Sequence, residues 1–133
     1  MNKRILIRKD ILYPDLSYRI IGVVFNVYNE LGYGYQEKIY QRSIGEGLKT
    51  ANISFEEQVP FNIKFKDNKI GSYFLDFLIE DKIILEVKKD DRFSKSNIEQ
   101  LSAYLKASNL KLGILVNFTK RGLLFKRVVN INS

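Results

Sequence analysis

The 133-residue sequence contains no cysteine, no histidine and no tryptophan, and it has only two prolines. Without cysteine there is no disulfide and no thiolate ligand for zinc. Without histidine there is no imidazole ligand and no histidine-based catalytic triad. Any hydrolytic chemistry must therefore use carboxylates, lysine, hydroxyl groups or a hard metal ion held by oxygen.

Long apolar runs are also missing. No stretch approaches the roughly 20 apolar residues that span a bilayer. The apolar part of the N-terminus, Ile5–Ile7, is too short for a signal peptide. We therefore expect a cytoplasmic protein without a membrane partner. An apolar share of 45% and an aromatic share of 13% suffice to build one core in a chain of this length.

Positive charge is in excess, with 22 lysines and arginines against 15 aspartates and glutamates, a net charge of +7. Such a balance favours a polyanionic partner, and nucleic acid is the commonest one. Lysines that only keep a small protein in solution would explain the charge equally well. The charge alone leaves the two interpretations open.

The apolar periodicity predicts a succession of helices and strands. We expect a helix capped by Asp15 or Ser17 and ending at 31, a helix over 36–51, strands over 59–65, 72–79 and 83–88, a helix over 94–108, and strands over 112–116 and 123–129. Short turns between the first three strands predict an antiparallel meander, and a helix before the fourth predicts a parallel crossover. The fold class is therefore α/β: a single domain over 16–133 with a mixed central sheet flanked by helices, preceded by an arm over 1–15.

Polar residues occupy strand faces that should be apolar. On the second predicted strand, Asp76 shares a face with Phe74 and Leu78. On the third, Glu86 shares a face with Lys88. If a three-residue turn joins these strands, the two carboxylates lie directly opposite each other on one face. Two buried carboxylates and a lysine require partners.

Adjacent carboxylates repel each other unless a positive charge lies between them, and a divalent cation with oxygen ligands is a common solution. Lys88 could then orient or deprotonate a water at the ion. The alternative is a metal-free salt-bridged cluster. Glu37 shares a helical stripe with Tyr40 and would supply a third carboxylate, although a glutamate at a helix start also stabilises the helix dipole. Gln100 and Tyr104, four residues apart, could orient a water or a phosphate, or lie on the surface.

These residues resemble those of a known superfamily. Asp76, the triplet Glu86–Lys88 and Gln100 on the next helix resemble the PD-(D/E)XK nuclease superfamily, whose core has the predicted order of helix, three strands, helix and strand. More narrowly, Gly34–Tyr40 (GYQEKIY) resembles the signature of the GxxExxY protein family. Further phrases are similar to that family: Gln58–Pro60 (QVP), Gln100–Lys106 (QLSAYLK) and Leu112–Phe118 (LGILVNF). The resemblance extends over about 16–130.

The resemblance implies roles for individual residues. Asp76 and Glu86 would bind Mg²⁺ or Mn²⁺, with the Val87 carbonyl as a further ligand and Lys88 as the catalytic lysine. Glu37 would support or join the metal site, and Gln100 would lie near it. The family often has histidines where this chain has Tyr28 and Asn97, so a histidine-dependent step is not expected here.

Two functions are compatible with this set of residues. The first is a metal-dependent nuclease that hydrolyses phosphodiester bonds of DNA or RNA. The second is a non-catalytic module that binds nucleic acid or protein on the same scaffold. Four basic residues after the site strand, Lys88, Lys89, Arg92 and Lys95, would contact phosphates without reading bases, unless they are merely solvated. The oligomeric state is open, and a homodimer is one option.

Overall fold

A computed structural model describes residues 12–130 of the chain. Its elements in order are α2 (Pro14–Leu31), α3 (Glu37–Thr50), β1 (Phe55–Phe65), β2 (Asn68–Ile79), β3 (Ile83–Lys88), α4 (Lys95–Ser108), β4 (Leu112–Thr119) and β5 (Gly122–Val129). The order and type of every element agree with the prediction from sequence. None of these helices is both long and apolar enough to cross a membrane.

The five strands form one mixed sheet with the order β1-β2-β3-β4-β5. Strands β3 and β4 are parallel, with α4 as the crossover between them, and the other neighbouring pairs are antiparallel. This topology confirms the predicted meander and parallel crossover. All eight residues of β4 are buried, because a parallel strand at the centre of such a sheet is covered on both faces.

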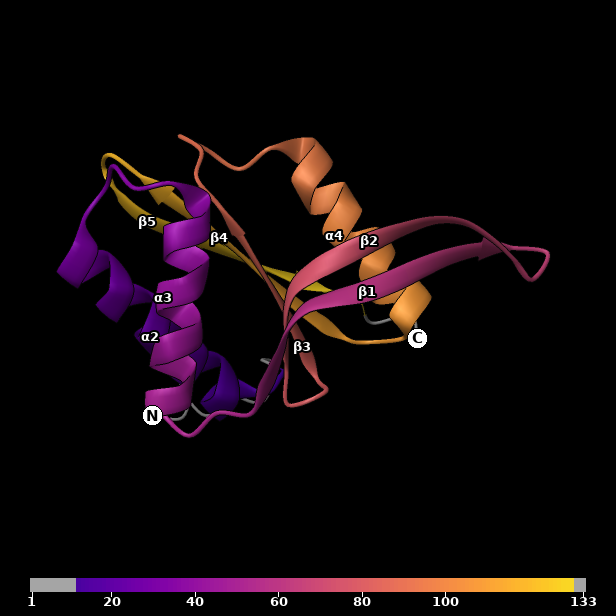
Figure 1. The fold of residues 1–133 in the computed structure, drawn as a ribbon, viewed down its shortest axis with the longest axis horizontal. Coiled ribbons are helices and arrows are strands. Elements are labelled where there is room, and N and C mark those ends of the chain that lie inside the picture. The colour runs from indigo at the N-terminus through magenta and orange to yellow at the C-terminus, as the bar shows by residue number, and fades with distance from the viewer. Residues whose placement is uncertain (1–11, 131–133) are drawn as a thin grey trace, which may run out of the picture.

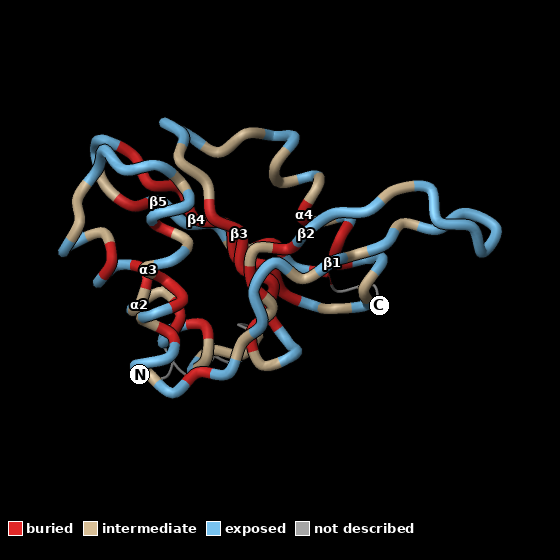
Figure 2. The backbone as a smooth tube through the Cα atoms, viewed as in Figure 1, coloured by how far each residue is buried: buried red, intermediate tan, exposed pale blue. Residues whose placement is uncertain are grey.

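Helices cover both faces of the sheet (Figure 1). On one face, α2 and α3 pack on a core that includes Ile20, Ile44 and Val116. On the other face, α4 packs through Leu101 and Leu105 on a second cluster. Figure 2 shows the buried backbone concentrated at β3 and β4, whereas the far ends of β1 and β2 are exposed. The polar residues of β3 therefore lie between two apolar layers.

Helix α2 begins earlier than expected. Its first residue is Pro14, which suits this position because proline has a preset φ and a helix needs no N–H donor there. The prediction that Asp15 or Ser17 caps the helix is wrong, because both lie inside it. The predicted arm, 1–15, thus overlaps the helix, and its residues 1–11 lie outside the described residues.

Strands β1 and β2 are longer than predicted and form an extended hairpin. We expected a turn at 67–69, but β2 already begins at Asn68. The turn consists of Lys66 and Asp67, which both have positive φ, 52° and 65°. Two consecutive residues of this kind form the tight connection that matches the twist of a hairpin. The hairpin therefore continues well beyond the part predicted from alternation alone.

Where the hairpin joins the rest of the sheet, the regular alternation of its side chains between the two faces is broken. Leu75 packs in the cluster below α4, whereas Phe77, two residues further, packs with α2 and α3. On β1, Gln58 interrupts the extended backbone with a φ of 48°, and such an interruption bends and twists a strand. Phe74 is 62% exposed. The prediction that Phe74 shares a face with Leu78, which packs below α4, is therefore wrong.

Candidate active site

The predicted carboxylate pair forms where β2 separates from β3. The strand register pairs Phe77 with Leu85, and the next position along places Asp76 opposite Glu86, as predicted. There the carboxylates take the place of the backbone hydrogen bonds between the two strands. The backbone N–H of Asp76 donates to Glu86 Oε2 at 2.8 Å, and the backbone N–H of Val87 donates to Asp76 Oδ2 at 2.8 Å. Each carboxylate thus satisfies a backbone donor that the diverging strands leave unpaired.

Burial makes this pair electrostatically unusual. Glu86 is only 7% exposed. Burial, together with the negative charge of Asp76, raises the pKa of Glu86 to about 8. Burial also raises the pKa of Asp76, although the hydrogen bond from Val87 opposes this shift. Without a cation, the pair therefore retains a proton at neutral pH.

Lys88 and Glu37 extend the cluster. The positive charge of Lys88 lowers the pKa of Glu37, Asp76 and Glu86, so the lysine lies within electrostatic range of all three carboxylates. Glu37, in the first turn of α3, is half-buried, and burial raises its pKa while a backbone hydrogen bond from Lys89 lowers it. The structure therefore brings together four of the predicted site residues.

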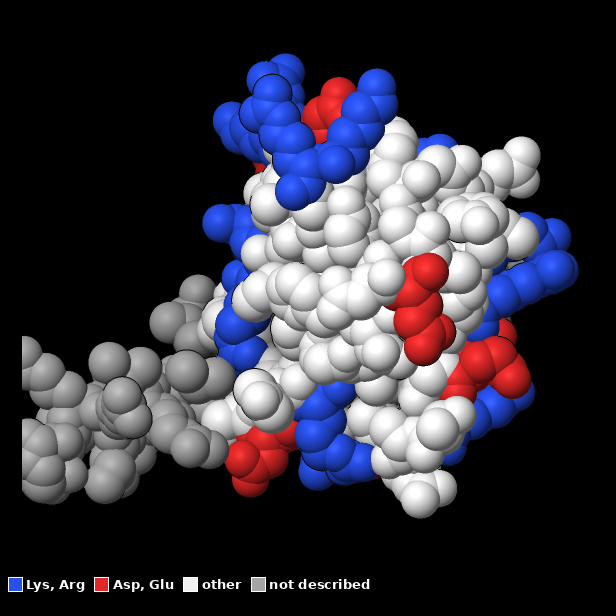
Figure 3. All heavy atoms as spheres, turned by 90° about the vertical axis from the view of Figure 1, so that its left-hand side faces the viewer, with Lys and Arg blue, Asp and Glu red and all other residues white. Residues whose placement is uncertain are grey.

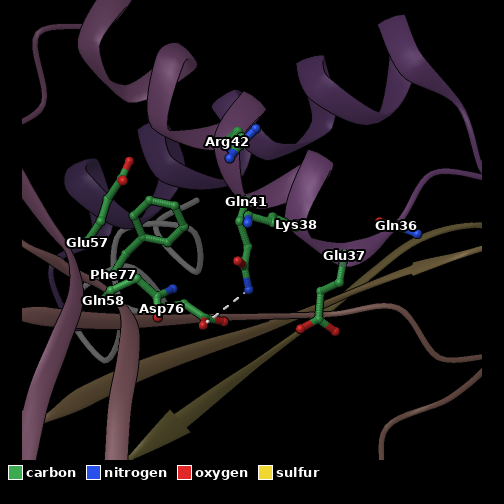
Figure 4. Close-up of a pocket in the computed structure, with 9 residues that line it drawn as sticks. All are labelled: Gln36, Glu37, Lys38, Gln41, Arg42, Glu57, Gln58, Asp76 and Phe77. Carbon is green, nitrogen blue, oxygen red and sulfur yellow. Dashed lines mark hydrogen bonds between the residues drawn. The ribbon is translucent and has the colours of Figure 1, made fainter.

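Two amide side chains that sequence reasoning missed hold Asp76. Gln41 Nε2 donates to Asp76 Oδ1 at 3.3 Å (Figure 4), and a side-chain hydrogen bond from Gln58 lowers the pKa of Asp76. Gln41 lies one helical turn after Glu37, so the helical spacing was an available signal for it. Gln58 belongs to the phrase Gln58–Pro60 that resembles the GxxExxY family, but that phrase alone does not indicate a contact with Asp76.

A cavity of about 690 Å³ opens beside Asp76. It lies between α3 and the base of the β1–β2 hairpin (Figure 4). The lining residues are mostly polar or charged: Gln36, Glu37, Lys38, Gln41, Arg42, Glu57, Gln58, Asp76 and Phe77. Asp76 is thus accessible from this side, whereas Glu86 is buried behind it.

On the α4 side, Tyr104 lies within electrostatic range of the pair. Burial and the nearby charge of Glu86 raise the pKa of the Tyr104 hydroxyl. Gln100 is half-buried one helical turn earlier. Among the described residues, no hydrogen bond joins Gln100 to the carboxylates. Its predicted place near the site therefore stays a prediction.

Asn117 has an unsatisfied side chain beside the site. It is 0% exposed, and neither polar atom of its amide has a hydrogen-bond partner among residues 12–130. It lies on β4 as the Cα partner of Lys88 on β3. A buried amide without partners typically costs about 1–3 kcal/mol of stability.

We expect Asn117→Leu to raise the free energy of unfolding by about 1 kcal/mol or more, because the substitution removes unpaired polar atoms at similar volume. Chemical denaturation measures the change. Asn117→Ala is the matched control and should lower stability, because it leaves a cavity. A leucine variant less stable than the wild type would show that the amide is hydrogen-bonded in solution.

The donors at the pair fit a hard divalent ion. Both side chains offer carboxylate oxygens, and Mg²⁺ is usually bound through one or two carboxylates; the Val87 carbonyl stays a predicted ligand. Over residues 12–130, however, no three acidic side chains form a group that could hold a metal. Glu37 interacts with the pair through its charge, and its role as a direct ligand stays a prediction.

The four basic residues predicted to contact phosphates lie in different surroundings. Lys89 is half-buried and its Nζ lies 5.1 Å from the ring centroid of Tyr33, whereas Arg92 and Lys95 are exposed. Two aspartates, at 90 and 91, interrupt the same segment. Figure 3, viewed from the side of α2 and α3, shows basic side chains gathered at the upper rim and charges of both signs elsewhere. That side therefore has no continuous basic surface.

Comparison with known proteins identifies the class. The model of the PD-(D/E)XK nuclease superfamily matches residues 14–128, and the chain belongs to this superfamily. The narrower GxxExxY family stays a prediction. A search of curated proteins finds no match. A solved structure, of the protein SSO0001, is similar with a TM-score of 0.55 at 20% identity, over 87% of this chain and 59% of that one. This chain thus spans less than two thirds of SSO0001, and the likeness concerns the fold.

Proposed function

We propose that the protein is a metal-dependent nuclease that hydrolyses phosphodiester bonds of DNA or RNA. The observation that carries this proposal is the buried Asp76–Glu86 pair next to Lys88. Burying two carboxylates in contact is costly, and it raises the pKa of both. A bound divalent cation would offset that cost, which explains why an acidic pair is kept inside a basic protein.

In this proposal, Asp76, Glu86 and the Val87 carbonyl hold Mg²⁺ or Mn²⁺. Such an ion stabilises charge on a phosphate and makes hydroxide available near neutral pH. The other residues act by position and charge. The Lys88 ammonium lies where it can stabilise negative charge on a phosphate oxygen, and Gln41 keeps the Asp76 carboxylate in one orientation.

The cavity between α3 and the hairpin base is the proposed entrance for the nucleic acid. Lys38 and Arg42 line it beside Asp76, and both are exposed. The segment with Lys89, Arg92 and Lys95 would contact phosphates further along. Because these contacts are to the backbone, we propose that binding tolerates many sequences. We also propose membership of the GxxExxY family on the strength of Gly34–Tyr40.

A specific observation favours the second candidate, a non-catalytic binding module. The carboxylates of Asp76 and Glu86 accept the backbone N–H groups of the diverging strands. They would therefore be useful to the fold even without a metal ion. The same experiment distinguishes the two functions.

The test is incubation of supercoiled, single-stranded and branched DNA, and of RNA, with the full chain and Mn²⁺. We expect cleavage by the wild type and a rate at least about 100-fold lower for Lys88→Ala, because the variant loses the charge next to the reacting phosphate. Gel analysis of the products measures the rate.

Lys111→Ala is the matched control. It removes the same charge from an exposed lysine next to the end of β4 that pairs with the start of β3, and it should cleave like the wild type. Cleavage by Lys88→Ala at the wild-type rate would refute the assigned role of Lys88. If the wild type and both variants bind nucleic acid tightly but none of them cleaves it, the binding module is favoured.

A further inference from the structure

The outer half of the β1–β2 hairpin projects from the body of the protein (Figure 1). We call residues 60–74 of this hairpin the arm; this segment is distinct from the predicted N-terminal arm, 1–15. Every residue from 64 to 70 is exposed, and Figure 2 shows this end of the hairpin as the longest exposed stretch of backbone in the view. The inner face of the arm near its base packs on α4, where Phe61 and Tyr73 contact the Tyr104 ring. The outer part has no such support.

The arm combines positive charge with exposed apolar side chains. Lys64, Lys66 and Lys69 are all exposed, and Asp67 is the only acidic residue between 60 and 74. Large apolar side chains accompany them: Phe65 is 62% exposed, Ile70 65% and Phe74 62%. Single exposed apolar residues are ordinary on a protein surface, and it is the grouping of three on one short hairpin that points to a contact site.

Protection of a sheet edge explains part of this composition. Strand β1 is at the edge of the sheet, and proline and lysine on an edge strand prevent pairing with another chain. Pro60 and Lys64 fit that role. It does not account for Phe65 or Phe74, because exposed phenylalanines promote association. Edge protection is also indifferent to the sign of the charge, whereas binding of a polyanion is not.

Phe61 and Tyr73 face α4, so alternation along the strands puts Phe65 on that face of the hairpin and Phe74 on the opposite face. We propose that the arm binds a single-stranded segment of nucleic acid that crosses the hairpin, with its lysines on phosphates and Phe65 and Phe74 each stacked on a base. Exposed rings can stack only on bases that are not already stacked in a duplex, and lysines with aromatic rings are the usual combination for single strands. Phe74 is two residues from Asp76 along β2, so a strand held by the arm leads toward the carboxylate pair. The proposal rests on the proposed function, because the bound strand would be the substrate.

The test measures binding of the full chain in EDTA, so that no cleavage occurs. A fluorescent single-stranded DNA 20-mer and the duplex of the same sequence are the probes, read by anisotropy. We expect Phe65→Ser/Phe74→Ser to weaken single-strand binding roughly tenfold or more and duplex binding little, because stacking is lost. Both side chains are exposed, so the variant should fold, and circular dichroism verifies this.

Charge is tested separately. Lys64→Ala/Lys66→Ala/Lys69→Ala should reduce the slope of log affinity against log salt by about two units on the single strand. Reversal of the three lysines to glutamate should abolish binding, although the variant elutes like the wild type in size-exclusion chromatography because the edge stays charged. The control is the same reversal at Lys120, Arg121 and Lys126, which are exposed and belong to the β4–β5 turn and β5, outside the arm.

The outcomes separate this proposal from the proposed function. If the wild type binds neither probe, the nucleic-acid substrate itself is refuted. If the wild type binds and the arm variants bind equally well, only the arm proposal is refuted. The arm proposal is also contradicted if the arm and control reversals lose the same affinity for DNA. It is contradicted as well if the serine variant loses the same affinity for the single strand and for the duplex. Binding of anionic vesicles that is lost in the serine variant, with DNA binding unchanged, would assign the arm to a membrane surface instead.

Discussion

Asp76→Asn is expected to reduce the affinity for Mn²⁺ more than about 100-fold. Replacing residues that only orient a ligand typically costs 10–100-fold, and Asp76 is a proposed ligand itself. Asparagine retains the shape of the side chain and can still accept the hydrogen bond from the Val87 N–H. The lost affinity therefore reports the missing negative charge. Isothermal titration calorimetry of wild type and variant measures the effect directly.

Glu57→Gln is the matched control for this titration. Glu57 lines the same cavity as Asp76, yet it is not part of the carboxylate pair. Its replacement removes one negative charge from the cavity and should leave Mn²⁺ affinity nearly unchanged. If Asp76→Asn binds Mn²⁺ as tightly as the wild type, the ion is bound elsewhere or not at all, and the metal assignment is wrong.

Glu86→Gln is expected to make the metal-free protein more stable than the wild type at alkaline pH. The pKa of Glu86 is raised from 4.5 to about 8 in the folded state. A group with a raised folded-state pKa contributes stability that is present below its unfolded pKa and is lost as the pH rises through the folded pKa. The wild type should therefore lose a few kcal/mol between about pH 5 and pH 9. Glutamine does not ionise and should remove most of this loss.

Denaturant titrations in EDTA at several pH values measure this dependence. Glutamine mimics the protonated acid, because its carbonyl can accept the Asp76 N–H and its amide can donate to the Asp76 carboxylate. Glu99→Gln is the control, since Glu99 is an exposed glutamate on α4 and should leave the pH profile unchanged. Equal alkaline losses in wild type and Glu86→Gln would contradict the raised pKa.

Local sequence patterns were sufficient for the elements and most of the topology. Strand β3 was predicted with its observed bounds, and α4 was predicted to start at Ser94, which is its N-cap and whose hydroxyl accepts the N–H of Asn97. The three-residue turn between β2 and β3 was enough to place Asp76 opposite Glu86, because antiparallel register follows from turn length. These features depend on residues close together along the chain.

The site was predictable only in part. The carboxylates and Lys88 stood out because charges interrupt strands that should be apolar. Gln58 and Asn117 did not, since each depends on its neighbours in space: Gln58 reaches Asp76 from another strand, and Asn117 is buried between β4 and its covering layer. From sequence, an asparagine or glutamine on a strand is expected to be exposed to solvent, and only the packing shows that it is buried.

By itself, the sequence determined the α/β order, the register of the acidic pair and the exclusion of thiolate, imidazole and disulfide chemistry. Only the tertiary structure decided that β2 changes the face it turns to α4 between Leu75 and Phe77, and that Phe74 is exposed. Alternation in a sequence assumes a regular strand. The reversal arises from the positive φ at Gln58, and the packing of helices on both faces sets which side chains meet, so neither is encoded in local periodicity.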